Sequence, residues 1–361
     1  MSPDLALQGA TPHLIDEWQE VPELWDVVRG KVDSSPLKGQ FILTGSATIN
    51  KDKYIHSGTG RIARLRMRPM SLYESGQSDG KISLEDVCNG KAGDSLTGDV
   101  DLKKLIDLVL MGGWPAIGNM SLEQGILIAR EYMKSIIQED IYKVDGVRRD
   151  NHKIELLLKS LARNESTTVT NTTLKKDIKE KNFDDISLDT LTDYLNLFDR
   201  LYLTENIPPF SSKIRSSLRV KQSEKRHFVD PSLPCALLKL TEGKLLNDLE
   251  LFGFLFESLV ERDLYTYAES FHANLYHYQD YGNNEMDAVI EMEDGNWCGI
   301  EIKLGANQIE AAASNLMKIN HKIEENGGKA AISLCVICGL SNAAYRRKDG
   351  VYVVPITSLR P

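Results

Sequence analysis

The last third of the chain carries the clearest pattern of apolar and polar positions. Helical spacing and apolar runs follow one another from residue 252 to residue 356. The predicted elements are a helix at 252–268, strands at 275–279, 285–292 and 297–304, a helix at 308–325, and strands at 330–338 and 351–356. This αβββαβ order with one further strand predicts that residues 245–361 form an α/β domain.

The pattern of side chains on the strands at 285–292 and 297–304 predicts the register in which the two strands pair. If the residues between them form a three-residue loop with Gly295 in the left-handed conformation, residue 287 pairs with residue 301. A two-residue loop would set Asp287 and Glu301 on opposite sides of the sheet. We therefore expect Asp287 and Glu301 to point the same way, with Lys303 on the strand face of Glu301. The same register makes one face wholly apolar, with Met286, Ala288, Ile290, Met292, Cys298, Ile300, Ile302 and Leu304.

The middle of the chain combines helical spacing with short strand-like runs. Helices are predicted at 154–163, 172–181 and 187–198, and strands at 201–207 and 226–230. Ser187 is a candidate N-cap. Three helices with a two-stranded wing indicate the winged-helix variant of the helix-turn-helix, which binds duplex DNA.

The predicted wing is rich in basic residues, with Glu224 as its one acid. Such a composition suits phosphate contacts. The alternatives are a solvated, flexible loop or a wing that docks a partner protein. The basic residues are Lys213, Arg215, Arg219, Lys221, Lys225 and Arg226.

The pattern of the segment before the winged helix predicts a lid and a connector. Residues 75–98 are rich in Gly, Ser, Asp and Lys, and a helix is predicted at 102–111, where a Gly-Gly-Trp-Pro turn follows. A longer helix is predicted at 123–140 and continues into residue 150. The expected domains are therefore 1–75, a helical lid at 76–125, a connector and winged helix at 126–240, and the α/β domain at 245–361.

Length and composition indicate a multidomain globular protein. The 361 residues are 42% hydrophobic and 26% charged, no apolar run reaches the length of a membrane span, and no signal peptide is evident, so we expect a cytoplasmic protein. Cys335 and Cys338 lie in an apolar run and are predicted to be core residues rather than metal ligands. The net charge of −9 means that any DNA contact must come from a local basic patch.

The N-terminal segment has two motifs at the ends of predicted strands. Leu-Ile ends in Asp16-Glu17, and Phe-Ile-Leu ends in Thr44-Gly-Ser46. In a nucleotide site Asp16 would hold Mg²⁺, Glu17 would polarise the attacking water, and Thr44 or Ser46 would sense the γ-phosphate. The alternative is an exposed acidic pair at the end of a strand.

Together with Gly-Arg-Ile-Ala-Arg-Leu-Arg-Met-Arg-Pro-Met-Ser-Leu-Tyr-Glu at 60–74, these motifs resemble the AAA+-like ATPases that carry a nuclease-like C-terminal region. The resemblance covers essentially the whole chain and implies a partial P-loop/AAA+ α/β sheet and ATP binding. It also implies that the arginines at 61, 64, 66 and 68 could contact nucleotide across a subunit boundary. A strand with a solvated cationic face is the alternative.

The sequence departs from the family pattern at the phosphate-binding loop, and this departure bears on ATP hydrolysis. No Gly-x-x-x-x-Gly-Lys-Ser/Thr loop occurs in the sequence, so the cradle for the β- and γ-phosphates is missing. Either the true start lies upstream or the gene is a truncated copy. Without the strand that precedes such a loop, the edges flanking residues 14–15 and 41–43 would be unpaired, which favours association into a homo-oligomer.

The C-terminal αβββαβ order resembles the core of the PD-(D/E)XK, or restriction-endonuclease-like, fold. The resemblance implies that Asp287 and Glu301 bind Mg²⁺ or Mn²⁺, that Lys303 positions or activates water, and that Glu257 orients water or a second metal. The alternatives are a structural ion-pair cluster or a nuclease relic kept for binding. Against catalysis, residues 245–294 carry twelve acids and only one basic residue, Arg262.

We predict that the purified chain does not hydrolyse ATP, because the loop that would stabilise the transferred phosphate is absent. The measurement is phosphate release with Mg²⁺ and ATP, with Glu17→Gln as the paired variant. Turnover above background that disappears in Glu17→Gln would contradict the prediction.

Overall fold

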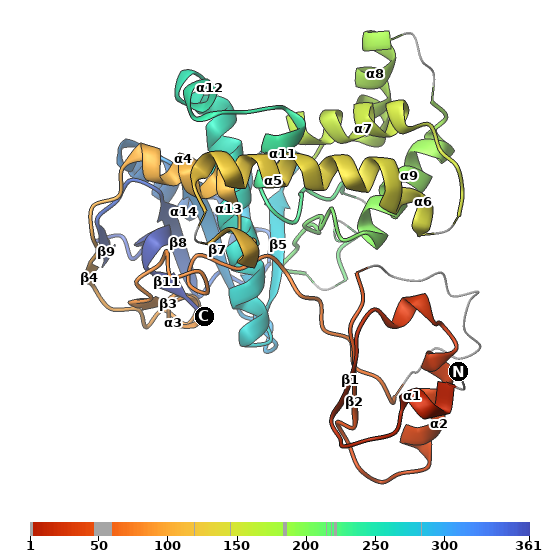
Figure 1. Cartoon of the computed structure of the whole chain (residues 1–361). Helices are drawn as coiled ribbons and strands as arrows, with labels where there is room; N and C mark the ends of the chain where they lie inside the picture. The colour runs from red at the N-terminus through yellow and green to blue at the C-terminus, as the bar shows by residue number, and fades with distance from the viewer. Residues whose placement is uncertain are drawn as a thin grey trace.

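The computed structural model describes residues 3–46, 60–118, 120–144, 146–182, 186–213, 215–217, 219, 222–282 and 284–361. Its N-terminal unit is small and lies apart from the rest in Figure 1. This unit consists of α1 (Pro3–Ala6), β1 (His13–Ile15), the 3₁₀ turn η1 (Trp18–Glu20), α2 (Leu24–Asp33) and β2 (Phe41–Leu43). The strands β1 and β2 pair in parallel, and α2 covers one face. The opposite face exposes 61% of Leu14 and 51% of Ile42.

The segment after the N-terminal unit is extended and packs inward through its arginines. Residues 62–71 form no strand, which excludes the alternative of a strand with a solvated cationic face. The guanidinium of Arg68 donates two hydrogen bonds, of 2.9 and 2.8 Å, to the carboxylate of Glu205. Arg66 lies 3.3 Å from the same carboxylate and stacks over Tyr202. These two arginines therefore neutralise a carboxylate of the middle part of the chain.

Residues 82–111, expected as part of a lid, instead pack with the C-terminal sheet. They form β3 (Ile82–Ser83), α3 (Leu84–Cys88), β4 (Ser95–Leu96) and α4 (Leu102–Met111). β4 pairs with β9 (Ala343–Arg346), and β3 pairs with β11 (Leu359–Arg360). The apolar side chains of α3 and α4 belong to the same buried cluster as the central strands. The physical reason is burial, because these residues complete the core of the larger sheet.

The middle of the chain is helical. A short turn, η3 (Pro115–Ile117), leads to α5 (Leu122–Ser135), which Ser121 and Gln124 cap, and the helix continues through a π-helical turn, η4 (Ile136–Asp140), into α6 (Ile141–Lys143). It does not reach residue 150, because Asp150 caps the next helix instead. The following helices are α7 (Asn151–Arg163), α8 (Asn171–Asn182), α9 (Leu188–Arg200), α11 (Ser232–Leu237) and α12 (Glu242–Asn247).

Three of these helices, α7, α8 and α9, occur where the sequence predicts them. Ser187 caps α9 by accepting a hydrogen bond from the N–H of Thr190, as predicted. The expected wing strands are reduced to isolated bridges: Thr204 pairs with Phe228 and Ile207 with Lys225, while Thr167 pairs with Arg226. The three helices and the bridged segments share one apolar core with α5 and α11.

The C-terminal domain contains the predicted elements in the predicted order, with β9 and β11 as two further short strands. It consists of α13 (Leu249–Ser270), β5 (Asn274–Gln279), β6 (Glu285–Glu291), β7 (Trp297–Lys303), η5 (Ala306–Gln308), α14 (Ile309–Glu325), β8 (Ser333–Cys338), β9, β10 (Tyr352–Pro355), η6 (Ile356–Ser358) and β11. Across the described residues the main sheet has seven strands in the order β4-β9-β10-β8-β7-β6-β5. The strands β7, β8 and β10 run parallel to one another. Cys335 and Cys338 are buried in β8, as predicted for core residues.

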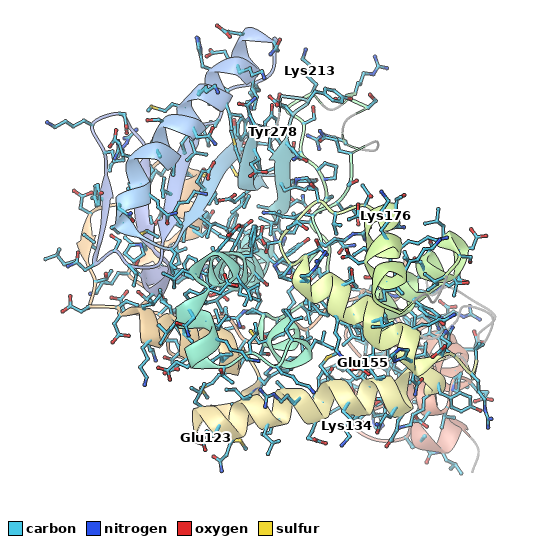
Figure 2. The ribbon with its side chains drawn as sticks, turned by 90° about the horizontal axis from the view of Figure 1, so that it is seen from above. Glu123, Lys134, Glu155, Lys176, Lys213 and Tyr278 are labelled. Atoms are coloured by element: carbon cyan, nitrogen blue, oxygen red, sulfur yellow. The ribbon has the colours of Figure 1, made fainter. Side chains whose placement is uncertain are left out.

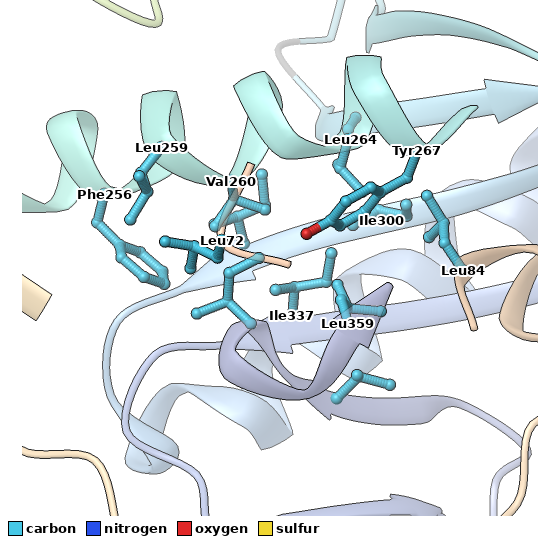
Figure 3. Packing of buried hydrophobic residues seen from close by; sticks show 14 of the residues in the cluster. Leu72, Leu84, Phe256, Leu259, Val260, Leu264, Tyr267, Ile300, Ile337 and Leu359 are labelled. Atoms are coloured by element: carbon cyan, nitrogen blue, oxygen red, sulfur yellow. The ribbon is translucent and has the colours of Figure 1, made fainter. Parts of the chain in front are cut away.

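The sheet lies between two helical layers. α13 covers one face together with α3 and α4, and α14 covers the other. Figure 3 shows Phe256, Leu259, Val260 and Leu264 of α13 above Ile300 and Ile337 of the strands. Among the described residues no helix has both the length and the apolar character needed to cross a membrane.

The β6–β7 hairpin has the predicted register. Ala288 pairs with Ile300 and Ile290 pairs with Cys298, which places residue 287 opposite residue 301. Gly295 has a φ of 73°, and its N–H donates to the carbonyl of Met292. The three-residue loop with a left-handed glycine is therefore confirmed.

Replacing Gly295 with Ala should lower the stability of the C-terminal domain by about 1 kcal/mol, because a side chain is strained at this φ. The control is Gly253→Ala in α13, where an added Cβ meets no atom within 4 Å. Alanine at that helical position should raise stability by roughly 0.5 kcal/mol. Urea denaturation followed by circular dichroism measures both. Equal effects of the two substitutions would contradict the assigned loop conformation.

Candidate functional site

The hairpin brings Asp287, Glu301 and Lys303 together, as the sequence predicts. The ammonium of Lys303 lies 2.9 Å from Asp287 Oδ2 and 2.5 Å from Glu301 Oε2. Asp287 Oδ2 also accepts a hydrogen bond of 2.7 Å from the backbone N–H of Ile302. The two carboxylates and the ammonium thus form one compact cluster beside the end of β7.

A bulge in β6 helps to aim Asp287. Tyr276 pairs with Val289, whereas Tyr278 pairs with Met286, so β6 has one residue more than β5 between these pairs. Bulges commonly re-aim a side chain next to a functional site. The bulge also corrects the predicted face of Met286, whose side chain packs with Trp297 on the α14 side of the sheet.

A residue that the sequence analysis missed orients Glu301. Asn315 of α14 donates a hydrogen bond of 2.7 Å to Glu301 Oε1 and another of 3.1 Å to the carbonyl of Glu285. Asn315 lies within the predicted helix, but no feature of the sequence sets it apart from the other polar residues there. Glu301 is consequently held from two sides, by an amide and by an ammonium.

Glu257, the fourth predicted residue, lies on α13 and pairs with a different lysine. Its carboxylate accepts a hydrogen bond from Lys225, and Glu261 one turn later accepts another of 2.6 Å. Lys225 also donates a hydrogen bond of 2.9 Å to the backbone carbonyl of Asp287. The sequence predicts Lys225 among the phosphate-binding residues of a wing, whereas the structure buries it against α13 and β6.

Burial and neighbouring charges shift the pKa values of the two carboxylates in opposite directions. Burial raises the pKa of Asp287, but Lys303 and Lys225 outweigh it and hold that pKa below its usual range. Burial and the charge of Asp287 raise the pKa of Glu301 to about 7. Burial lowers the pKa of Lys303, and the two carboxylates outweigh that effect and raise it. Asp287 and Lys303 therefore favour their charged forms, while Glu301 holds its proton to a higher pH than an exposed glutamate does.

The donor set suits a hard divalent cation. Mg²⁺ and Mn²⁺ prefer oxygen ligands, and Mg²⁺ is usually bound by one or two carboxylates with several waters. Asp287 and Glu301 supply two such carboxylates. The described residues contain no group of three or more His, Cys, Asp or Glu side chains placed to hold a metal. The Lys303 ammonium lies between the carboxylates, and its side chain is 27% exposed.

The N-terminal motifs also meet in space. The hydroxyl of Thr44 donates a hydrogen bond to the carboxylate of Asp16, and the hydroxyl of Ser46 donates one of 3.3 Å to Glu17 Oε2. Gln19, which the sequence analysis missed, bridges Glu17 and Ser46. Glu17 has a φ of 49°, a left-handed conformation that is uncommon for a residue with a side chain. Parallel pairing of β1 with β2 explains why the four predicted residues converge.

The predicted DNA-binding residues have different surroundings. Lys213 and Arg215 are exposed, and Figure 2 shows Lys213 at the outer edge of the molecule. Arg219 instead donates hydrogen bonds of 3.0 and 2.7 Å to Glu291 and stacks over Phe210. Its guanidinium joins the loop to the C-terminal domain, which removes it from the set available to phosphates. Lys221 lies outside the described residues.

Replacing Glu301 with Gln should change how stability depends on pH. The pKa of Glu301 rises from its ordinary value of 4.5 to about 7 on folding. Its contribution to stability is therefore full below about pH 4.5 and is lost as the pH rises through 7. Relative to the wild type, Glu301→Gln should gain stability over this range, by roughly 3 kcal/mol in total.

Urea denaturation in EDTA at pH 4.5 to 8 measures this difference. The control is Glu293→Gln on the exposed hairpin loop, for which the difference from wild type should stay flat. A constant gap between Glu301→Gln and wild type, or a wild type that gains with pH, would show that the carboxylate is not desolvated as described.

Comparisons with known proteins divide the chain into three parts. Residues 4–76 match a family described as an AAA domain, and residues 102–244 and 252–359 match two families described as domains of unknown function, DUF8612 and DUF4143. No curated protein and no solved structure matches the chain. Residues 4–76 are therefore similar to an AAA domain, whereas the two other matches carry no described function.

Proposed function

We propose that residues 245–361 form a PD-(D/E)XK-type domain that cleaves DNA with a divalent metal ion. The observation that carries this proposal is the position of the Lys303 ammonium, within 2.9 Å of both the Asp287 and the Glu301 carboxylate. Two carboxylates and a lysine on neighbouring strands are the groups that metal-assisted phosphodiester hydrolysis needs. The element order α13-β5-β6-β7-α14-β8 supports the same assignment.

Each residue has a role that follows from its contacts. Asp287 and Glu301 would hold Mg²⁺ or Mn²⁺, and Asn315 and the N–H of Ile302 fix the directions of their oxygens. The bound metal would supply a Lewis acid and lower the pKa of a coordinated water. Lys303 is a cation beside both carboxylates, so it would hold the attacking water or offset charge on the phosphate.

The remaining parts are proposed to bring DNA and nucleotide to this domain. The three helices α7, α8 and α9 with their bridged segments support a winged-helix interpretation. Lys213 and Arg215 are the exposed residues of that region that we assign to DNA phosphates. We propose that ATP and Mg²⁺ meet the chain at an incomplete nucleotide site formed by Asp16, Glu17, Thr44 and Ser46.

A second candidate function is a non-catalytic interaction module that binds DNA or protein. The observation in its favour is that the carboxylates of the candidate site already have cationic partners inside the chain. Lys303 pairs with Asp287 and Glu301, and Lys225 pairs with Glu257. In this case the cluster stabilises the sheet, and exposed Lys213 and Arg215 retain the ligand.

Incubation of linear and nicked DNA with Mg²⁺ or Mn²⁺ distinguishes the two functions. We expect metal-dependent cleavage by the wild type, and a loss of at least about 100-fold in Glu301→Ala and Asp287→Asn, because removing one electrostatic stabiliser has that order of effect. Glu293→Gln, on the exposed hairpin loop, should cleave as well as the wild type.

Equal cleavage by the wild type and Glu301→Ala would count against the nuclease proposal. Absence of cleavage together with DNA retention in a gel shift, lost in a Lys213→Glu/Arg215→Glu variant, would instead favour the binding module.

A further inference from the structure

Lys225 is a buried cation that the middle of the chain inserts into the C-terminal domain. It follows the basic loop after α9, and its backbone pairs with Ile207 through a bridge. Its side chain is 8% exposed. The ammonium has three oxygen acceptors: the carboxylates of Glu257 and Glu261, the latter at 2.6 Å, and the carbonyl of Asp287 at 2.9 Å. A lysine has three N–H donors, so each of them has a partner.

The oxygens around Lys225 are the kind that a hard divalent cation takes. Glu257 and Glu261 are four residues apart on α13, so their carboxylates lie on one face of the helix. Together with the carbonyl of Asp287 they give two carboxylates and one backbone oxygen, which are all hard oxygen donors of the kind that divalent cations take. Glu257 and Glu261 accept hydrogen bonds from the ammonium at the position where such an ion would be held.

Asp287 belongs to both cation positions. Its side chain pairs with Lys303, and its backbone carbonyl accepts the hydrogen bond from Lys225. The two positions are therefore adjacent, because one residue of β6 contributes an oxygen to each. Adjacent cations that share ligands are the arrangement of two-metal phosphodiesterases, whose ions lie roughly 4 Å apart.

We infer that Lys225 takes the place of a second metal ion, so that the candidate site binds one divalent cation and the chain itself supplies the other positive charge. This inference rests on the proposed function for its catalytic meaning. Lys225 is then a positioning residue, because it holds Glu257 and the Asp287 backbone while Asp287 and Glu301 take the metal. The site is complete only when the segment that carries Lys225 is docked on α13.

Glu261 has further partners besides Lys225, whereas Glu257 does not share them in the part of the chain that the structure describes. The second oxygen of Glu261 accepts a hydrogen bond of 3.1 Å from Ser166 and lies 3.3 Å from His227 Nε2. Both residues also come from the middle of the chain. Glu261 thus keeps its other partners if Lys225 is lost, whereas Glu257 would lose the one cation with which it pairs among the described residues.

The test is the number of Mn²⁺ ions bound per chain, measured on the full chain by isothermal titration and by the electron paramagnetic resonance signal of free Mn²⁺. Lys225→Met should bind one Mn²⁺ more than the wild type. The added ion should be absent from Lys225→Met/Glu257→Gln/Glu261→Gln. Lys176→Met, which removes an exposed lysine of α8, should bind as many ions as the wild type.

Stability gives a second readout if Lys225→Met folds poorly in EDTA. Mn²⁺ should then raise its unfolding temperature by several degrees more than that of the wild type. An unchanged number of ions, or a variant that Mn²⁺ does not stabilise beyond the wild type, would overturn the inference.

A different result of the same experiment would reject the proposed function. Its metal site is the ion that the wild type binds and that Asp287→Asn or Glu301→Gln loses. A wild type without Mn²⁺ and a Lys225→Met variant with one Mn²⁺ would reject the metal site at Asp287 and Glu301 while supporting the assignment of Lys225.

Discussion

The burial of charge around α13 is the constraint on which the rest of the structure depends. A buried carboxylate without a partner costs several kcal/mol, so each must be matched when the chain folds. Arg262 on α13 is almost fully buried between Asp230 and Asp263, at 2.9 and 2.8 Å. Asp263 also accepts the N–H of Leu72, and Asp230 accepts the N–H of Gly113. Segments from distant parts of the sequence are thereby fixed to one helix.

The same constraint shapes the candidate site. Lys225 and His227 reach the acids of α13 from the middle of the chain, while Lys303 reaches Asp287 and Glu301 from β7. The C-terminal domain therefore cannot bury its acids without the segment that follows α9. This dependence explains why twelve acids in residues 245–294 with a single basic residue do not make a uniformly repulsive surface: several of them are neutralised internally.

The sequence predicts the centre of the site well and its surroundings poorly. The β6–β7 register could be predicted because the apolar pattern and the acidic pattern require the same pairing. The bulge that turns Met286 to the other face leaves no such signal, since it depends on how β5 pairs. β3 and β4 have two residues each, too few for periodicity to reveal. Composition alone marked Arg219 and Lys225 as phosphate ligands, because their partners Glu291 and Glu261 lie far away in sequence.

We propose that Asp287 and Glu301 hold a divalent cation, and that Lys225 fills the neighbouring position. Anomalous scattering from crystals soaked in Mn²⁺ tests it most directly. We expect one peak within coordination distance of both carboxylates and no peak between Glu257 and Glu261. A peak between Glu257 and Glu261 with Lys225 displaced, or ordered Mn²⁺ only at sites remote from Asp287 and Glu301, would contradict it.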